Sequence, residues 1–248
     1  MIDKDRIILK STASGFGKYV YCGRKWLLDN DSSLDWFRKG KHDSYDESQK
    51  TKSLKIGQQN EYRCIKWLMT RLHKTGSVLF DGTGQANYQS FTTKMHTFKT
   101  TLQCRPDLIV KHEDQTILYE FKAVGKCHYR LMPEFDSSHA QVWCYRSIKD
   151  FKIDKYYLFR YYEDPFNFDA FPNIKELKSI ELSDEKFIPH FEQYIDAIKV
   201  LNRIKTAPNR SYSNNIIAKL YKPINAPDKC FNCIYNVDKI CKPKFRPR

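Results

Sequence analysis

Two carboxylates and a lysine stand close together in the segment RPDLIVKHEDQTILYEFKAV, residues 105–124. Asp107 opens a first β-prone run, and Glu120 and Lys122 lie in a second run that follows a polar turn. Residues two apart on a strand point to the same side, so Glu120 and Lys122 share a face while Phe121 points to the opposite side. If the two runs pair as a hairpin, Asp107 reaches the same end of the sheet and joins them.

Such a cluster offers what phosphodiester hydrolysis needs. Carboxylate oxygens are preferred ligands of Mg²⁺ and Mn²⁺. A bound metal polarises a phosphoryl oxygen and lowers the pKa of bound water, and a nearby lysine orients or deprotonates that water. A Glu-x-Lys pair alone is more often a solvated ion pair, so the Pro-Asp on the preceding strand gives the pattern its weight. The sequence therefore predicts a centre with one or two metal ions.

Two predicted helices flank this cluster. Apolar residues recur at helical spacing over residues 54–73, and Glu61 lies on that helix. The segment over residues 137–150 also has a helical pattern, and its Gln141 and Tyr145 are four apart, so they project from one face and can reach a common ligand. The alternatives are an exposed helix glutamate at Glu61, a core tyrosine at Tyr145 and a rim residue at Gln141.

The rest of the sequence predicts the helices and strands that position these residues. The sequence predicts an amphipathic helix over residues 11–28, a polar surface loop over 29–52, and short strands between 77 and 124 that form one meandering sheet. An aromatic strand is predicted at 155–162, followed by a long helix at 184–205 that starts at Ser183 and Asp184. This order of helices and strands predicts an α/β fold.

The charge balance points to a polyanionic partner. Lysine and arginine total 43 against 29 aspartates and glutamates, which gives a net charge of +14 spread along the chain. A basic surface attracts phosphate backbones through Coulomb forces and counterion release, and the alternative is a basic protein without such a partner. We expect no membrane segment, because no apolar run approaches the ~18 residues needed to span a bilayer. No signal-peptide core opens the sequence, which predicts a cytoplasmic protein.

The C-terminal cysteines have the spacing of a metal site. Cys230 and Cys233 form a Cys-x-x-Cys pair, and Cys241 follows. The last 26 residues contain few apolar side chains, so burial alone does not order them. From the residues alone, these three cysteines are either metal ligands, with zinc as one suitable metal, or thiols that bind no metal. Four other cysteines lie among apolar or strand residues and are predicted to be buried thiols: Cys64, Cys104, Cys127 and Cys144.

Three of these patterns occur in the order of a known family. Arg-Pro-Asp at 105–107 with Glu-Phe-Lys at 120–122 resembles the PD-(D/E)xK nuclease signature. IGQQNEYRCIKWL resembles the first motif of the RecB-like branch, with Glu61 where many members have His, and HAQVWCYRS resembles its Gln-x-x-x-Tyr motif. The resemblance implies that Glu61, Asp107 and Glu120 hold the metal. It also implies that Lys122, Gln141 and Tyr145 complete the catalytic set.

The cysteines extend the resemblance to one subset of that branch. Cys22 in YVYCGRKWLL is similar to the N-terminal cysteine of CRISPR-associated RecB-like exonucleases and of the AddB nuclease domain, although Gly23 stands in place of the usual proline. The resemblance implies that Cys22, Cys230, Cys233 and Cys241 bind a [4Fe-4S] cluster. Such a cluster would tie the N-terminal helix to the C-terminal tail, and zinc is the alternative.

The resemblance covers most of the chain and implies a restriction-endonuclease-like core in a single domain, with an N-terminal segment at 1–53, the core at 54–165 and a C-terminal part at 166–248. We expect a stand-alone nuclease, an exonuclease by analogy, acting on single-stranded DNA or DNA ends in recombination, repair, phage replication or CRISPR adaptation. The resemblance also implies partner proteins of a recombination, replication or CRISPR complex. Lys126, His128 and Arg130 are weak candidates for DNA contacts. The alternatives are a catalytically weak DNA-binding module and a scaffold.

Overall fold

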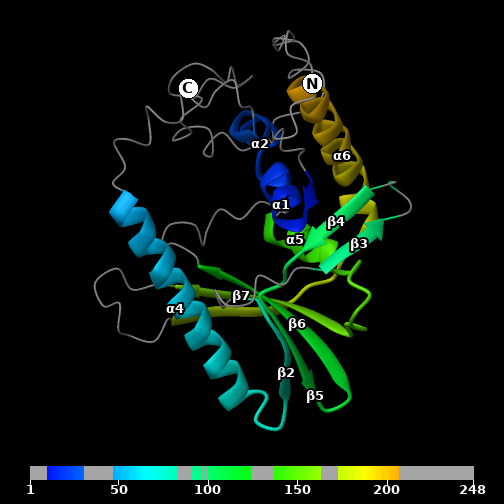
Figure 1. Ribbon diagram of the computed structural model, residues 1–248. Helices are drawn as coiled ribbons and strands as arrows, with labels where there is room; N and C mark the ends of the chain where they lie inside the picture. Colours follow the sequence, from blue (N-terminus) through cyan, green and yellow to red (C-terminus); the bar gives the residue numbers. More distant parts are fainter. Residues whose placement is uncertain are drawn as a thin grey trace, which may run out of the picture.

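The computed structural model of the protein describes residues 10–30, 47–82, 91–95, 98, 100–123, 137–162 and 173–206 (Figure 1). Three predicted cluster ligands, Cys230, Cys233 and Cys241, lie outside these residues, as do the weak DNA contacts Lys126, His128 and Arg130. The architecture is α/β, with mixed sheets flanked by helices. It is compatible with a restriction-endonuclease-like core.

The strands form two sheets instead of the single meandering sheet that the sequence predicted. The larger sheet has the order β2-β5-β6-β7-β8, and the smaller one has the order β1-β4-β3. Pro106 follows β4 closely, and proline has no N–H to donate, so strand pairing ends at Cys104 and begins again at Leu108 in the other sheet. The strands are β1 Ser11–Thr12, β2 Ser77–Asp81, β3 Phe91–Met95, β4 Thr100–Cys104, β5 Leu108–His112, β6 Gln115–Ala123, β7 Lys155–Tyr162 and β8 Asn173–Ser179.

The predicted hairpin is present between β5 and β6. Leu108 pairs with Tyr119, and the antiparallel register runs to His112 and Gln115 at the turn. Glu113 in that turn has a positive φ of 53°. β6 then pairs with β7 in parallel, and a parallel pair requires a crossover connection. The connection carries helix α5, Ser137–Tyr145, which contacts β6 and β7.

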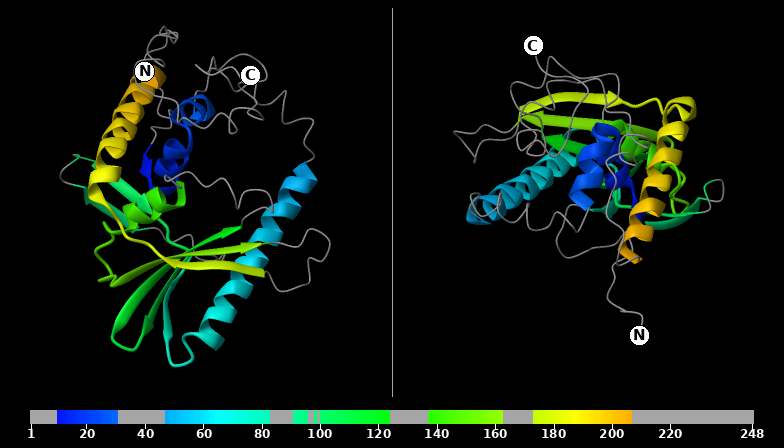
Figure 2. Two further views of the ribbon diagram at one scale, coloured as in Figure 1. Left: turned by 180° about the vertical axis from the view of Figure 1, so that it is seen from behind. Right: turned by 90° about the horizontal axis from the view of Figure 1, so that it is seen from above.

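The two faces of the larger sheet are covered by different helices (Figures 1 and 2). Ile117, Tyr119 and Phe121 of β6 pack in one core cluster with residues of α4, Glu47–Arg71. Leu118 belongs to a second cluster with residues of α5 and of the other helices, α1 Ala13–Tyr21, α2 Gly23–Asn30 and α6 Asp184–Thr206. Because side chains alternate along a strand, the even-numbered residues of β6 face α5.

The helices differ from the predicted ones mainly at their ends. The predicted helix over 11–28 is two helices, because Cys22 adopts an extended backbone (φ −164°, ψ 103°) that ends α1. Thr12 caps α1, and its hydroxyl accepts the Gly15 N–H at 2.9 Å. The predicted loop over 29–52 was wrong at both ends, where α2 continues to Asn30 and α4 begins at Glu47. The long helix begins at Asp184 as predicted.

The larger sheet extends beyond residue 165, where the sequence placed the end of the core. β8 was not predicted, and it pairs antiparallel with β7 as the edge strand of that sheet. Its sequence NIKELKS alternates only weakly between apolar and polar residues, which explains why the periodicity did not reveal it. None of the helices in the described part of the chain combines the length and the apolar character that a membrane span requires.

Candidate active site

The β5–β6 hairpin brings Asp107 beside Glu120. The last ladder pair is Leu108 with Tyr119, and one further step in the same register sets Asp107 opposite Glu120. Directly opposite residues on antiparallel strands have their side chains on the same face. The Phe121 N–H donates to Asp107 Oδ2 at 2.7 Å, so the carboxylate takes the place of the next backbone acceptor. The Gly82 N–H donates to the Asp107 carbonyl at 2.8 Å and anchors its backbone to the end of β2.

Glu120 is completely buried, with 0% of its surface exposed. Its two carboxylate oxygens are held from two directions. Lys122 Nζ donates to Oε1 at 2.6 Å, and the Tyr145 hydroxyl lies 3.1 Å from Oε2. A buried carboxylate is tolerated only when its oxygens are paired in this way, because the lost hydration has to be replaced. The alternation along β6 therefore points Glu120 and Lys122 toward α5, on the face that the sequence predicted they share.

Helix α5 supplies the second half of this hydrogen-bond network. Gln141 Nε2 donates to the Tyr145 hydroxyl at 2.7 Å, and Lys122 Nζ donates to Gln141 Oε1 at 3.4 Å. The Tyr145 hydroxyl also lies 2.9 Å from the Arg105 carbonyl, so its proton is shared between that oxygen and Glu120. Their spacing of four on one helix face is what lets Gln141 and Tyr145 reach the same strand. Tyr145 is fully buried in the core, as its alternative stated, and Gln141 is partly exposed, but both side chains also make these polar contacts.

A glycine in α1, Gly17, allows helix α5 to pack closely against α1. A Cβ built on Gly17 would lie 2.7 Å from the Ser137 carbonyl oxygen and 3.5 Å from the Gln141 Cβ. Only a residue without a side chain allows this approach of the two helices. Gly17 therefore helps to set the position of Gln141 relative to the sheet.

Glu61 lies on α4, which packs on the opposite face of the sheet, yet it interacts electrostatically with the cluster. Burial raises its pKa to about 7, Lys122 and Arg105 lower that pKa, and Glu120 and Asp81 raise it. Within the described residues, no group of three or more His, Cys, Asp and Glu side chains has an arrangement that would hold a metal ion. The structure thus brings Asp107 and Glu120 together and places Glu61 within electrostatic range of them.

The pKa values of the carboxyl groups at the site are raised by burial and by one another. Burial and the neighbouring Glu120 raise the pKa of Asp107 well above its ordinary value, against the lowering effect of Lys122. Burial lowers the pKa of Lys122, but Glu120 and Asp107 raise it more, so the net shift is upward. Carboxyl oxygens are the hard donors that divalent cations prefer, so the acidic residues supply the ligand type, although not, among the residues that the structure describes, an assembled metal site.

Sequence reasoning missed three residues near this site. Arg105 lowers the pKa of Glu61 and Asp81 raises it, and neither residue was predicted to act at the site. Arg160 is buried, with 8% exposed, and lies opposite Lys122 in the parallel β6–β7 register. A charged residue inside the aromatic run KYYLFRYY was the available signal, because burial of an arginine requires partners.

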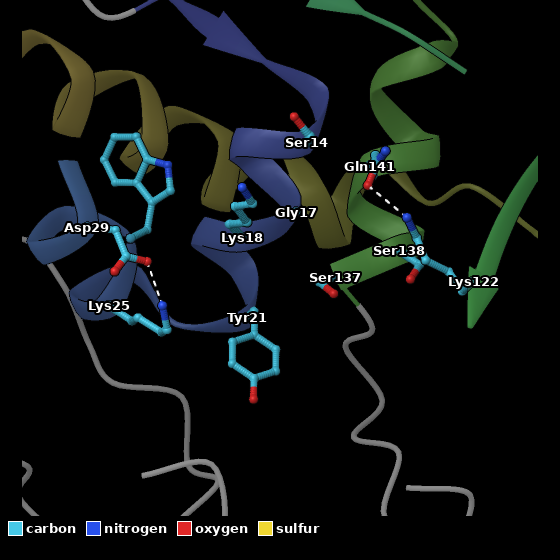
Figure 3. Close-up of a pocket in the computed structure, with 11 residues that line it drawn as sticks. Ser14, Gly17, Lys18, Tyr21, Lys25, Asp29, Lys122, Ser137, Ser138 and Gln141 are labelled. Carbon is cyan, nitrogen blue, oxygen red and sulfur yellow. Dashed lines mark hydrogen bonds and ion pairs between the residues drawn. The ribbon is translucent and has the colours of Figure 1, made fainter. Parts of the chain in front are cut away.

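A pocket opens beside the cluster (Figure 3). Its volume is about 560 Å³, and Lys122 and Gln141 belong to its wall. Helices α1 and α2 form the opposite wall. The described residues that line it are Ser14, Gly17, Lys18, Tyr21, Lys25, Trp26, Asp29, Lys122, Ser137, Ser138 and Gln141.

Cys22 is the predicted cluster ligand that the structure describes. It stands at the junction of α1 and α2 and is partly exposed, and the Lys25 N–H lies 3.4 Å from its sulfur. Three of the cysteines predicted as structural thiols, Cys64, Cys104 and Cys144, are buried as expected, whereas Cys127 lies outside the described residues.

No family model and no curated protein matches the chain. Among solved structures, the chain is similar to a crystal structure of SSO0001, at 12% sequence identity and a TM-score of 0.43, over 97% of this chain and 88% of that one. A similarity of this size carries no argument about function, which has to come from the residues themselves.

Proposed function

We propose that the protein is a metal-dependent deoxyribonuclease of the PD-(D/E)xK type, in the RecB-like branch. The observation that carries this proposal is the convergence of Asp107, Glu120 and Lys122 at one end of the β5–β6 hairpin, with Lys122 Nζ 2.6 Å from Glu120. Gln141 and Tyr145 join the same hydrogen-bond network from α5. The net charge of +14 supports a nucleic-acid substrate.

The acidic residues would hold Mg²⁺ or Mn²⁺. Asp107 and Glu120 are the primary ligands in this proposal, and Glu61 is the third. When bound, such a metal polarises the scissile phosphoryl group and lowers the pKa of a coordinated water. One or two ions are compatible with these residues.

Lys122 is assigned the role of an ammonium group. The net upward shift of its pKa keeps it protonated at neutral pH, which makes deprotonation of water by its amine unfavourable. Its Nζ instead donates hydrogen bonds, orients the attacking water and stabilises negative charge that develops on the phosphate. Gln141 and Tyr145 act as positioning residues, because they hold Lys122 and Glu120 in this geometry.

The cellular role and the iron-sulfur cluster are proposed together with this assignment. We propose that the enzyme works in the cytoplasm as an exonuclease on single-stranded DNA or DNA ends, within recombination, repair, replication or CRISPR adaptation. We also propose that Cys22 joins Cys230, Cys233 and Cys241 around a [4Fe-4S] cluster. The partly exposed residue Cys22, at a helix junction, fits a ligand position. Iron analysis and absorbance at about 400 nm of anaerobically purified protein distinguish this cluster from zinc.

Digestion of end-labelled single-stranded and duplex DNA with Mg²⁺ or Mn²⁺ tests the activity. We expect Asp107→Ala and Lys122→Ala to lower the cleavage rate by at least about 100-fold, while Lys178→Ala, an exposed change on β8, leaves it unchanged. Equal product from Lys122→Ala and wild type would refute the assignment. DNA binding without metal-dependent cleavage would instead support a DNA-binding or scaffold protein.

A further inference from the structure

The pocket beside the cluster is continuous with the proposed catalytic residues. Lys122 and Gln141 belong both to its wall and to the hydrogen-bond network around Glu120. Figure 3 shows these residues on one side and Lys18, Tyr21 and Lys25 of α1 and α2 on the other. A polymer whose phosphate lies against Lys122 therefore has its neighbouring residue at the mouth of this pocket.

The charges on the wall favour an anionic occupant. Lys18, Lys25 and Lys122 line the pocket together with one carboxylate, Asp29. Asp29 forms an ion pair with Lys25 at 2.6 Å, and Lys122 is paired with Glu120. Lys18 is exposed and, among the described residues, its ammonium group is paired with no carboxylate. Ser137 and Ser138 of the first turn of α5 also line the pocket, and the N-terminal end of a helix attracts anions.

The size of the pocket and its aromatic wall narrow the choice further. A volume of about 560 Å³ lies in the ordinary range for small-ligand sites and accommodates about one nucleotide. A base pair with two backbones would not enter. Tyr21 is 38% exposed on the pocket wall, which leaves ring surface for a base. Tyrosine rings stack on single-stranded bases without reading their sequence.

We propose that this pocket is the subsite for the nucleotide next to the scissile phosphate of a single DNA strand. In this subsite Lys18 binds a backbone phosphate and Tyr21 stacks on the base. Asp29 partly neutralises the positive charge of Lys25. The inference rests on the proposed nuclease function for its location, but it makes a separate claim about binding. It assigns the enzyme to strands that are single or frayed at the point of cleavage.

Fluorescence anisotropy in EDTA tests the subsite without cleavage. The probes are a fluorescein-labelled oligothymidylate and a duplex of equal length. We expect Lys18→Gln to weaken oligothymidylate binding by about three- to tenfold and to reduce its salt dependence by about 0.7 in the log–log slope, the value of one phosphate contact on a single strand. Asp29→Asn should tighten binding. Opposite signs from two changes in one pocket cannot both come from unfolding.

The tyrosine gives a second, uncharged test. We expect Tyr21→Ala to weaken oligothymidylate binding on the order of tenfold, whereas Tyr21→Phe retains the ring and most of the affinity. Lys149→Gln is the matched control for Lys18→Gln, because Lys149 is exposed beyond the C-terminal end of α5, away from the pocket. Duplex binding should change less than oligothymidylate binding in each pocket variant.

The results separate the two proposals. If wild type cleaves DNA and the Lys18→Gln and Tyr21→Ala variants bind oligothymidylate as the Lys149→Gln control does, the subsite is wrong and the nuclease assignment stands. If no metal-dependent cleavage occurs but the pocket variants change oligothymidylate binding as described, the subsite stands and the catalytic assignment fails. Equal loss of single-stranded and duplex affinity would contradict a subsite for one strand.

Discussion

Two buried tyrosine hydroxyls lie on opposite faces of β6, and each contacts an ionisable side chain. Tyr119 faces α4, and its hydroxyl lies 2.6 Å from His73 Nε2. Tyr145 faces β6 from α5, and its hydroxyl lies 3.1 Å from the carboxylate of Glu120. Burial and the neighbouring His112 lower the pKa of His73, so the first cluster is neutral at pH 7. The second gathers Asp107, Glu120 and Lys122.

This difference indicates which of the two buried polar clusters is the better candidate for a catalytic role. A neutral pair such as His73 with Tyr119 needs only a hydrogen bond to be tolerated in a core. A cluster of like charges costs free energy, and active sites are where proteins keep such clusters. The Tyr145 side of the sheet also has an adjoining pocket that Gln141 and Lys122 line. The charged cluster is therefore the functional candidate, and the neutral one is structural.

Removing one charge from the cluster should have the largest effect. Glu120→Gln keeps an oxygen for the Tyr145 hydroxyl but loses the negative charge, so we expect DNA cleavage to fall by about 100- to 1,000-fold. Stability should hold, because Asp107 remains near Lys122 and repulsion between the carboxylates is relieved. Cleavage rate and thermal midpoint are the two measurements. A large fall in the midpoint would mean that Glu120 is structural.

The matched change in the neutral cluster is Tyr119→Phe. It removes the partner of a buried His73 nitrogen, which costs about 1 to 3 kcal/mol of stability. The cleavage rate at a temperature where the variant is folded should equal that of wild type. Loss of activity in a folded Tyr119→Phe protein would remove the distinction between the two faces.

A substitution at Gly17 should change both the stability of the protein and its proposed cleavage activity. A Cβ at Gly17 would lie 2.7 Å from the Ser137 carbonyl, so Gly17→Ala has to push α1 and α5 apart. We expect a loss of about 1 to 3 kcal/mol in unfolding free energy and a lower cleavage rate, because Gln141 moves relative to Lys122. Denaturant unfolding and kcat measure the two effects. Gly57→Ala is the control, since a Cβ there meets nothing within 4 Å.

The part of the site that could be predicted from the sequence is the part governed by local periodicity. The spacing of two residues predicted that Glu120 and Lys122 share a face of β6. The spacing of four predicted that Gln141 and Tyr145 share a face of α5. The polar turn between 112 and 115 predicted the hairpin. These relations depend on a few neighbouring residues. The same is true of β7, whose bounds, 155–162, agree with the prediction.

Long-range relations could not be predicted in the same way. The pairing of Lys122 with Arg160, the contact of Gly17 with Ser137 and the position of Glu61 each depend on how elements distant in sequence pack together. A single sequence holds no local record of such contacts. The separation of β3 and β4 into their own sheet belongs to this class, although Pro106 gave a local hint.

Glu61 gives a pH-dependent test of the charged cluster. Its pKa of about 7 means that the metal-free carboxyl group is largely protonated below that pH. A metal that binds Glu61 has to release this proton, so its affinity should fall by about tenfold for each pH unit below 7, in addition to any proton released by Asp107. Glu61→Gln should reduce the slope by about one proton. Calorimetric titration with Mn²⁺ measures it, and an unchanged slope would exclude Glu61 as a ligand.

The neutral cluster should respond to pH through stability alone, and this is the smallest effect. Because burial lowers the pKa of His73, the unfolded chain binds a proton more readily than the folded protein does. The stabilisation is present above the ordinary histidine pKa of about 6.5 and is lost as the pH falls through and below it. We expect the thermal midpoint to fall between pH 7 and pH 5, and less so in His73→Gln. An equal fall in both proteins would assign the effect to other groups, and metal affinity of the His73→Gln variant should match wild type at every pH.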